Sequence, residues 1–235
     1  MPADNFIDIP FTTDNLDRYA IRTSILKAIN NSLPFFKGNL LDIGCGKMPY
    51  KYHILNNSSI DNYIGLDIDN ALVYDEKVKP DYTWDGITMP FNDEQFDTAF
   101  GTEVLEHCPD PVVILGEVNR ILKPGGMVFL TVPFLWPLHE VPHDECRFTP
   151  FSLRRILAAA GFKNIEIKAT GGWHASLAQM LGLWVRRAPL GVRKRKWLST
   201  LLKPLIKMLY NKDQLCEIGF NESQMITGLY LIAQK

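Results

Sequence analysis

The sequence lacks the features of an exported, disulfide-bonded or membrane-spanning protein. A bilayer span needs about 20 mostly apolar residues, and no stretch of this chain reaches that length without charged or several polar residues. The first residues, MPADNFIDIPFTTD, carry acids where a secretory leader carries positive charge. The four cysteines are widely spaced and form no C-x-x-C pair, which indicates reduced thiols. We therefore expect a cytoplasmic protein without a transmembrane helix.

Acidic residues are missing from one long stretch. Residues 170–212 contain nine basic residues and no Asp or Glu, whereas the rest of the chain holds 16 basic and 26 acidic residues. Apolar residues at helical spacing, including Trp184 and Trp197, accompany the basic ones, a combination typical of interfacial helices. We expect residues 173–212 to contact an anionic membrane surface, so that the protein is peripheral on the inner face of the membrane. The alternative is a pair of lid helices packed on the core.

The chain of 235 residues, with 46% hydrophobic and 22% charged residues, fits one large domain or one domain with an elaboration. Short apolar runs at 40–43, 63–67, 82–85, 96–101, 127–132, 164–169 and 227–233 predict strands, and several end on or beside an acid. Helical patterns alternate with them. Such alternation predicts an α/β fold with a mostly parallel sheet, which binds ligands at the carboxyl ends of its strands.

Helix boundaries are marked by local residue choices. Apolar spacing over 16–32 predicts a leading amphipathic helix. Asp110 is a suitable N-cap before Pro111, and the sequence KPGG at 123–126 should end that helix and turn the chain. Thr149 announces a second helix, which Gly161 should end as a C-terminal cap.

A glycine pair follows the first predicted strand. Gly44-Cys45-Gly46 lets the backbone turn tightly and approach a ligand closely. A nicotinamide-dependent dehydrogenase needs a third glycine where this chain has Pro49. The carboxylate of Asp42 would also repel a pyrophosphate but would favour an ammonium group. A ligand with an amino-acid end therefore fits better.

Two further acids end the next two predicted strands. Asp67 stands 23 residues after Gly44, where a carboxylate can accept hydrogen bonds from ribose hydroxyls. Asp85 ends the third strand, where the exocyclic amine of a base could reach it. Consecutive loops thus carry groups suited to an amino acid, a ribose and a base.

Five motifs in this order resemble the class I S-adenosylmethionine-dependent methyltransferases, in particular the methyltransferase type 11-like group. They are LLDIGCG, YIGLDID, WDGITMPF, FDTAFGTEVLEH with CPDP, and EVNRILKPGGMVFLTVPF. The resemblance covers roughly residues 40–169 and the final strand. It implies a Rossmann-like, doubly wound sheet of seven mostly parallel strands with an antiparallel last strand. It also implies S-adenosyl-L-methionine as the cofactor.

The resemblance further implies which residues contact the cofactor. The loop after the first strand surrounds the methionine end, the loop after the second holds the ribose, and the loop after the third meets the adenine. The loop after the fourth strand contacts the cofactor or else caps the following helix. The implied residues are Asp42, Gly44, Cys45, Gly46, Asp67, Ile68, Asp85, Gly86, Glu103 and His107. For Cys45 a packing role is favoured over a nucleophilic one, because no paired His or Asn accompanies it.

The segment PFLWPLHEVPHDECRFTPFSLRRILAAAGF resembles a subset of these methyltransferases associated with polysaccharide or glycolipid biosynthesis. That subset shares the signature H-E-x-P-x-D-x-x-R-[YF]-T after the fifth strand, which His139, Glu140, Asp144 and Arg147 match here. Methyl transfer to a hydroxyl requires alignment of donor and acceptor and the loss of one proton. His139 suits the role of general base, and the expected catalytic residues are His139, Arg147 and Asp144. The alternative is that they only fix the loop.

The same loop raises the question of a metal site. His139 and His143, with Glu140 and Asp144 beside them, have side chains that bind metals. Pro142 would break the helix that places ligands four residues apart on one face, and the acids have a basic partner nearby. We therefore expect no metal.

The predicted function is methylation of a hydroxyl on a glycan, a lipid-linked saccharide or another small molecule. One alternative is a cofactor-binding regulatory protein without turnover, which the complete acceptor-loop signature disfavours. Another is a nucleic-acid methyltransferase. The sequence TEVL at 102–105 replaces the N-P-P-[YF]-like tetrapeptide of that class, and the basic segment carries aliphatic residues instead of stacking aromatics. Nucleic acid is therefore not expected as a partner.

Three sequence ranges are expected to differ in organisation. Residues 1–36 form an N-terminal helical segment. Residues 37–169 and 225–235 form the methyltransferase domain. Residues 170–224 form a basic amphipathic helical insertion between the last two strands.

Overall fold

The structure is a computed structural model that describes residues 6–69, 78–213 and 218–235. Its strands are β1 Lys37–Ile43, β2 Ser59–Ile68, β3 Tyr82–Trp84, β4 Phe96–Thr102, β5 Leu122–Pro133, β6 Lys163–Ala169 and β7 Gly228–Gln234. Its α-helices are α1 Tyr19–Ser32, α2 Lys51–Asn57, α3 Pro111–Ile121, α4 Pro150–Ala159, α5 Trp173–Arg187 and α6 Val192–Asp213. Two short 3₁₀ helices are η1 Leu33–Phe35 and η2 Leu105–His107.

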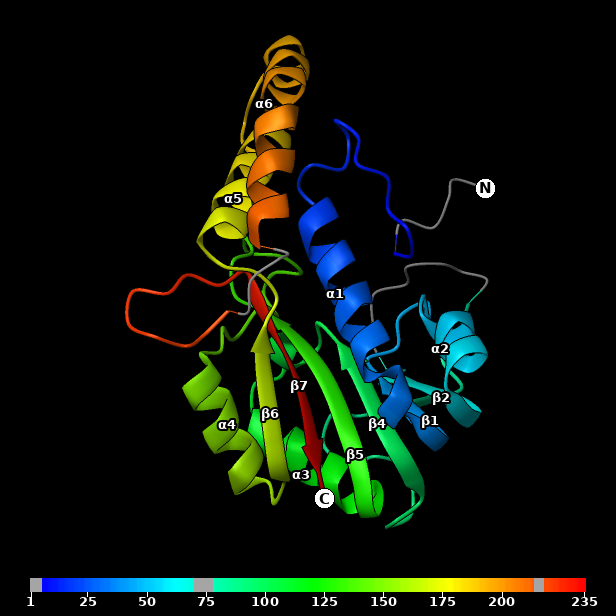
Figure 1. Cartoon of the computed structure of the whole chain (residues 1–235). Coiled ribbons are helices and arrows are strands. Elements are labelled where there is room, and N and C mark those ends of the chain that lie inside the picture. Colours follow the sequence, from blue (N-terminus) through cyan, green and yellow to red (C-terminus); the bar gives the residue numbers. More distant parts are fainter. Residues whose placement is uncertain (1–5, 70–77, 214–217) are drawn as a thin grey trace. The chain divides into compact units, whose positions relative to one another are not determined.

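The seven strands form one sheet in the order β3-β2-β1-β4-β5-β7-β6. β1 pairs in parallel with β2 and β4, β2 with β3, and β4 with β5. β7 runs in the opposite direction to β5 and β6 (Figure 1). The predicted Rossmann-like fold is therefore confirmed. The strand order reverses between β1 and β4, and open α/β sheets bind ligands beside the carboxyl ends of strands at such a point.

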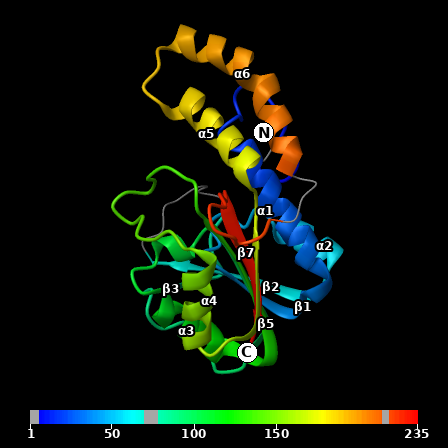
Figure 2. The ribbon, with the colours of Figure 1, turned by 60° about the vertical axis from the view of Figure 1, so that its left-hand side comes forward.

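Residues 29–132, 138–167 and 230–235 form one compact unit, here called the sheet unit. Phe100 on β4 and Phe129 on β5 are register partners whose rings stack with centroids 5.4 Å apart. Phe36 meets both rings edge-on at 5.6 and 6.0 Å. α2 lies on one face of the sheet, and α3 and α4 lie on the other (Figure 2). This double cover explains why the central strands are apolar on both faces.

Three of the predicted helix-boundary residues of the sheet unit are confirmed. The side chain of Asp110 accepts hydrogen bonds from the backbone N–H groups of Val112 and Val113 and so caps α3. Thr149 forms a capping box with Ser152 at the start of α4. Gly161 has φ +92°, the left-handed conformation that glycine adopts easily at the end of a helix.

One predicted boundary is wrong. α3 ends at Ile121, before the sequence KPGG at 123–126, and these four residues lie within β5, which begins at Leu122. The pairing of β4 with β5 shifts register in this region, since Phe96 pairs with Leu122 and Thr98 with Met127. A bulge in β5 therefore absorbs the glycine-rich turn.

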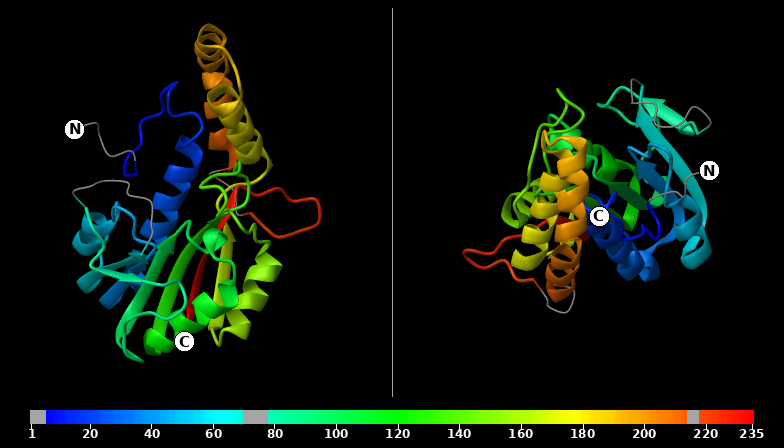
Figure 3. Two further views of the ribbon diagram at one scale, coloured as in Figure 1. Left: turned by 180° about the vertical axis from the view of Figure 1, so that it is seen from behind. Right: turned by 90° about the horizontal axis from the view of Figure 1, so that it is seen from above.

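Residues 1–28, 133–137 and 168–229 form a second compact unit, here called the helical unit. α5 and α6 run side by side in it, as Figure 3 shows from behind and from above. Gly182 on α5 packs directly on the backbone carbonyl of Leu16, and Arg187 forms an ion pair with Asp17 at 3.0 Å. The buried core residues of this unit are Leu16, Ala20, Ala175, Ala178, Val185, Leu198, Ile206, Leu209 and Tyr210.

Among the residues that the structure describes, no helix is both long and apolar enough to cross a membrane. The structure groups part of the N-terminal segment with the insertion. The three domain ranges stated from the sequence remain a prediction.

Candidate active site

The loop after β1 makes a tight turn with two glycines in the left-handed conformation. Gly44 and Gly46 have φ values of +61° and +49°. A Cβ atom on Gly44 would lie 2.6 Å from the side chain of Val104, which follows β4. The turn therefore packs against the loop after β4, at the carboxyl end of the sheet.

Asp42, at the end of β1, is buried inside the sheet unit. Its Oδ2 accepts a hydrogen bond of 2.6 Å from the hydroxyl of Tyr63 on β2. Burial raises the pKa of Asp42 to about 7, although the Tyr63 hydrogen bond opposes that rise. A cationic ligand group nearby would favour the ionised form.

Asp67 connects the ends of β1 and β2. Its Oδ2 accepts a hydrogen bond of 2.9 Å from the backbone N–H of Gly46, and its Oδ1 accepts one of 2.9 Å from Ile68. Burial raises the pKa of Asp67, and the charge of Glu140 contributes to the rise. Glu140 belongs to the loop after β5, so that loop lies within electrostatic range of the β2 end.

The loop after β3 combines an exposed acid with an apolar contact. Oδ1 of Asp85 accepts hydrogen bonds from the backbone N–H groups of Ile87 and Thr88 at 2.8 and 3.0 Å, which lower the pKa of Asp85. A Cβ atom on Gly86 would lie 4.0 Å from the side chain of Ile68, which is 48% exposed. An apolar surface is therefore open to a flat ligand group here.

Cys45 is a buried thiol. Its Sγ lies 2.9 Å from the position that a Cβ atom on Gly65 would occupy. Burial raises the pKa of Cys45 strongly, so the thiolate that a nucleophile requires is disfavoured. These observations support the packing role that the sequence favours.

The loop after β4 is tied to β5. Glu103 has φ +55°, and its Oε1 accepts a hydrogen bond of 2.8 Å from the hydroxyl of Thr131. Three residues later, Glu106 is completely buried within η2. Asp110 caps α3, so the cap of that helix does not depend on Glu103 or His107.

Three residues of the loop after β5 form one hydrogen-bonded group. Oδ1 of Asp144 accepts a hydrogen bond of 2.6 Å from Arg147, and its Oδ2 accepts a second one of 2.9 Å from the same side chain. Oδ2 also lies 3.2 Å from Nδ1 of His139. The Arg147 hydrogen bond holds the pKa of Asp144 well below its usual range. Burial lowers the pKa of His139. Because an ionised carboxylate only accepts, Nδ1 of the neutral ring carries the proton and Nε2 presents a lone pair.

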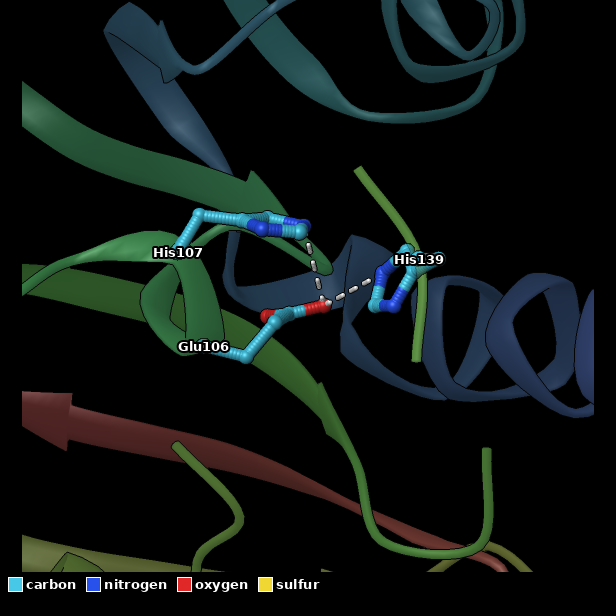
Figure 4. Close-up of side chains that lie close together, drawn as sticks. All are labelled: Glu106, His107 and His139. Carbon is cyan, nitrogen blue, oxygen red and sulfur yellow. Dashed lines mark ion pairs between the residues drawn. The ribbon is translucent and has the colours of Figure 1, made fainter. Parts of the chain in front are cut away.

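The structure brings His139 next to Glu106 and His107 (Figure 4). The backbone carbonyl of Glu106 accepts hydrogen bonds from Glu145 and Cys146 at 2.9 and 3.0 Å, which anchors the β5 loop on η2. Glu106 was not among the site residues inferred from the sequence. Its only signal is that it stands beside His107 in the motif TEVLEH.

The four possible metal ligands that the sequence suggested are not the ones that come together. In the described part of the chain, the clustered metal-binding side chains are Glu106, His107 and His139, whereas His143 is exposed and contributes only its backbone carbonyl. The segment from 137 to 149 contains no helix, as expected from Pro142.

The comparison with known protein families decides the class of this chain. Residues 41–130, from β1 to β5, match the family described as "Methyltransferase domain". The chain carries an S-adenosylmethionine-dependent methyltransferase domain. The matched segment contains the loops after β1, β2, β3 and β4.

Two curated relatives of this methyltransferase are similar over much of its length. Demethylmenaquinone methyltransferase of Staphylococcus carnosus is 29% identical over 186 residues, which cover 62% of this chain and 77% of the relative. Malonyl-[acyl-carrier protein] O-methyltransferase of Alcanivorax borkumensis is 26% identical over 166 residues, which cover 63% of this chain and 56% of the relative.

Solved structures share the fold of the methyltransferase. Phosphoethanolamine N-methyltransferase 2 of Haemonchus contortus, in complex with S-adenosyl-L-methionine, aligns with a TM-score of 0.56 and 19% identity over 97% of this chain and 60% of that chain. A Haloferax volcanii protein solved with the Trm112 methyltransferase activator aligns with a TM-score of 0.57 and 19% identity over 94% of this chain and 97% of that chain.

Proposed function

We propose that this methyltransferase transfers a methyl group to a hydroxyl of a glycan, in particular of a lipid-linked saccharide. The bond between the methyl carbon and the sulfonium sulfur breaks, and a bond between that carbon and the acceptor oxygen forms. The electron pair of the broken bond stays on sulfur, and the hydroxyl loses its proton. The protein must therefore align the two molecules and give that proton a destination.

The cofactor assignment rests on three consecutive loops. The methionine end lies at the turn of residues 44–46, where the carboxylate of Asp42 favours its ammonium group. The ribose lies at Asp67, whose oxygens retain lone pairs after accepting from the backbone. The adenine lies on Ile68 and Gly86, where an apolar side chain is exposed. Asp85 shapes that loop through its own backbone hydrogen bonds.

The observation that carries the acceptor assignment is the group formed by His139, Asp144 and Arg147. Arg147 holds the carboxylate of Asp144, and that carboxylate orients the ring of His139. Nε2 of His139 is thereby fixed beside the loop after β4, where the acceptor hydroxyl would lose its proton. His139 is the residue proposed to contact the acceptor, and Asp144 and Arg147 are positioning residues.

A lipid-linked acceptor is supported by the surface of the helical unit. Arg193, Lys194 and Lys196, at the start of α6, are exposed and form no ion pair with any described residue. Large apolar side chains on α5 and α6 are 40–63% exposed at helical spacing, namely Trp173, Leu177, Met180, Trp184, Trp197, Leu201, Leu205 and Met208. Exposed apolar stripes beside basic residues are the surface that an anionic membrane binds.

Not every basic residue of the segment contributes to that surface. Arg186 and Arg187 pair with Asp14 and Asp17 at 3.3 and 3.0 Å, and Arg195 donates to the carbonyl of Ala188. The proposal therefore rests on fewer basic residues than the net charge of the segment suggests.

A screen with isotope-labelled S-adenosyl-L-methionine tests the proposed function. Candidate acceptors are nucleotide sugars and lipid-linked saccharides in vesicles, with acceptor-free vesicles as the control. We expect label in a saccharide as a methyl ether, which resists the mild alkali that hydrolyses a methyl ester. Label that appears only in amines, carboxyl groups or RNA would contradict the proposal.

A further inference from the structure

Three side chains in the loops after β4 and β5 each offer one atom that could bind a metal ion. Oε1 of Glu106 lies 3.8 Å from Nε2 of His107 and 4.0 Å from Nε2 of His139. One ligand atom from each residue lies within 4.8 Å of the other two. Figure 4 shows the carboxylate oxygen between the two imidazole rings. Two loops that are separate in the sequence, after β4 and after β5, thus place two imidazoles and one carboxylate around one point.

The second nitrogen of each imidazole is already held by the protein. Nδ1 of His139 lies 3.2 Å from the Asp144 carboxylate, and Nδ1 of His107 lies 2.9 Å from the backbone carbonyl of His143. Both partners only accept, so each neutral ring carries its proton on Nδ1 and presents the Nε2 lone pair toward Glu106. A carboxylate or carbonyl on the second nitrogen is the arrangement that orients metal-binding histidines.

Glu106 supplies an independent indication of a ligand. Its side chain has no exposed surface, and neither carboxylate oxygen has a hydrogen-bond partner in the described part of the chain. A buried carboxylate is costly unless it is paired. In this tautomer the two nearest nitrogens present lone pairs to the carboxyl group instead of donating to it. A cation between the three side chains would supply the missing partner.

We propose that Glu106, His107 and His139 bind one divalent first-row transition-metal ion, for which Zn²⁺ is the best fit. Two histidines and one glutamate form an open zinc site, in which water or substrate takes the fourth position. Around four-coordinate Zn²⁺ the ligand atoms are roughly 3.4 Å apart, given bonds of about 2.0–2.2 Å. Side-chain adjustments on the order of 1 Å would bring the three atoms to that spacing. Mg²⁺ fits poorly because it prefers oxygen ligands.

The site is open on one side. The side chains of His107 and His139 are 19% and 22% exposed, whereas Glu106 is fully covered. Oε2 of Glu140 lies 3.8 Å from Nε2 of His107, so the position toward solvent is open to water, to a substrate or to this carboxylate. If the proposed function holds, the acceptor hydroxyl takes that position and the ion lowers its pKa. The Nε2 lone pair of His139 can bind the ion or accept the proton, but not both, so with the ion bound the hydroxyl proton passes to water instead of to His139. The metal binding itself does not depend on the proposed function.

Zn²⁺ binding to the whole protein tests the inference. After dialysis against EDTA, Zn²⁺ is titrated in competition with a chromogenic chelator, and Tm is measured with and without Zn²⁺. We expect one equivalent to bind and to raise Tm. Glu106→Gln, His107→Ala and His139→Ala should each weaken binding by at least ~100-fold, beyond the ~10–100-fold typical of residues that only orient a ligand.

His143→Ala is the matched control, because it removes an exposed imidazole of the same loop but keeps the carbonyl that holds His107. It should bind Zn²⁺ like the wild type. Circular dichroism checks the fold of each variant, and Glu106→Gln preserves the side-chain volume. With Co²⁺ as the probe, weak visible bands without an intense near-ultraviolet thiolate band would support nitrogen and oxygen ligands.

Two results would overturn the inference. One is the absence of saturable Zn²⁺ binding by the wild type. The other is equal binding by the three ligand variants, which would place the ion elsewhere, for example on cysteine. Either result would leave the proposed function intact if labelled methyl transfer still proceeds. Saturable binding that the three variants lose would support the site even if no acceptor is found.

Discussion

At the scale of single residues, Asp67 has two tasks that a substitution can separate. It accepts a hydrogen bond from Gly46 and so holds the turn after β1, and it is also the proposed ribose ligand. Lost hydrogen bonds to a charged group typically cost ~1.5–3 kcal/mol. Replacement by alanine removes both tasks, whereas replacement by asparagine keeps one acceptor oxygen.

We expect Asp67→Ala to weaken S-adenosyl-L-methionine binding by at least about tenfold in isothermal titration calorimetry. Asp67→Asn should lose less affinity. Asp61→Ala is the control, since Asp61 is an exposed acid on the same strand. Unchanged affinity in a folded Asp67→Ala protein would remove the ribose assignment.

His139 is expected to act on the acceptor and not on the cofactor. His139→Ala should therefore bind S-adenosyl-L-methionine like the wild type while kcat falls by at least about tenfold, since general acid-base catalysis typically contributes ~10²–10⁴-fold. Asp144→Asn should lower kcat more than it raises KM, because the ring of His139 loses its orienting carboxylate. Loss of cofactor binding by folded His139→Ala would move this residue to the other half of the site.

Glu106 shows what single residues in a sequence cannot reveal. The sequence places it beside His107, but the distance to His139, 33 positions later, depends on how two loops pack at the ends of β4 and β5. Asp42, Asp67 and the glycines were predictable because the two acids lie at the ends of β1 and β2 and the glycines directly follow β1. Their cofactor roles remain a prediction.

At the scale of elements, α5 and α6 each have two apolar sides. Residues such as Ala178 and Leu209 form the core of the helical unit, while Trp184 and Trp197 point outward and are 44% and 63% exposed. A helix packed on one side has no need of exposed tryptophans for its own stability. The outward side therefore supports docking on an apolar or interfacial surface.

Replacing Arg193, Lys194 and Lys196 with Gln should release the protein from anionic vesicles. Each basic residue near such a surface contributes roughly 1 kcal/mol, so the triple variant should partition on the order of 100-fold more weakly at low salt. Co-sedimentation measures the bound fraction. Added salt should also weaken the binding of the wild type to anionic vesicles, because it screens the attraction between the basic residues and the vesicle surface.

The matched control for that experiment replaces Lys27, Lys79 and Lys163, three exposed lysines outside the segment, with Gln. This variant has the same change in net charge and should still bind. If wild-type protein stays in the supernatant with anionic vesicles at low salt, the membrane proposal fails and the lipid-linked acceptor loses its main support.

At the scale of the whole molecule, the buried carboxylate of Asp42 should couple pH to stability. Its pKa is about 7 in the folded protein because of burial, against 3.8 as its ordinary value. Between these values the folded state holds a proton that the unfolded state has lost. The free energy of unfolding therefore falls as pH rises from about 4 to about 7, by at most ~1.4 kcal/mol per pH unit.

Asp42→Asn should remove this pH-dependent contribution to the free energy of unfolding. Compared with the wild type, the variant should gain free energy of unfolding as pH rises, by roughly 1–4 kcal/mol at pH 8, while the two proteins are similar at pH 4. Urea denaturation across this pH range measures the difference. Weaker S-adenosyl-L-methionine binding by the same variant would show that the carboxylate is kept for its ligand at the expense of stability. Parallel pH curves for the two proteins would contradict the assignment.

The fold and the enzyme class could be predicted from the sequence, because both depend on local signals. Alternating strand and helix patterns, capping residues such as Asp110 and Thr149, and the glycine turn after β1 act within a few residues of each other. Such local signals can be recognised in the sequence without knowledge of the tertiary structure.

Which side chains of the loops after β4 and β5 come together could be seen only in the folded protein. The segment from 137 to 149 has no helix and therefore no periodicity from which contacts could be predicted. Its position follows from hydrogen bonds to the backbone of Glu106 and from the hydrogen-bonded ion pair between Arg147 and Asp144. These are contacts between loops at the ends of neighbouring strands, and their geometry exists only once the sheet has assembled.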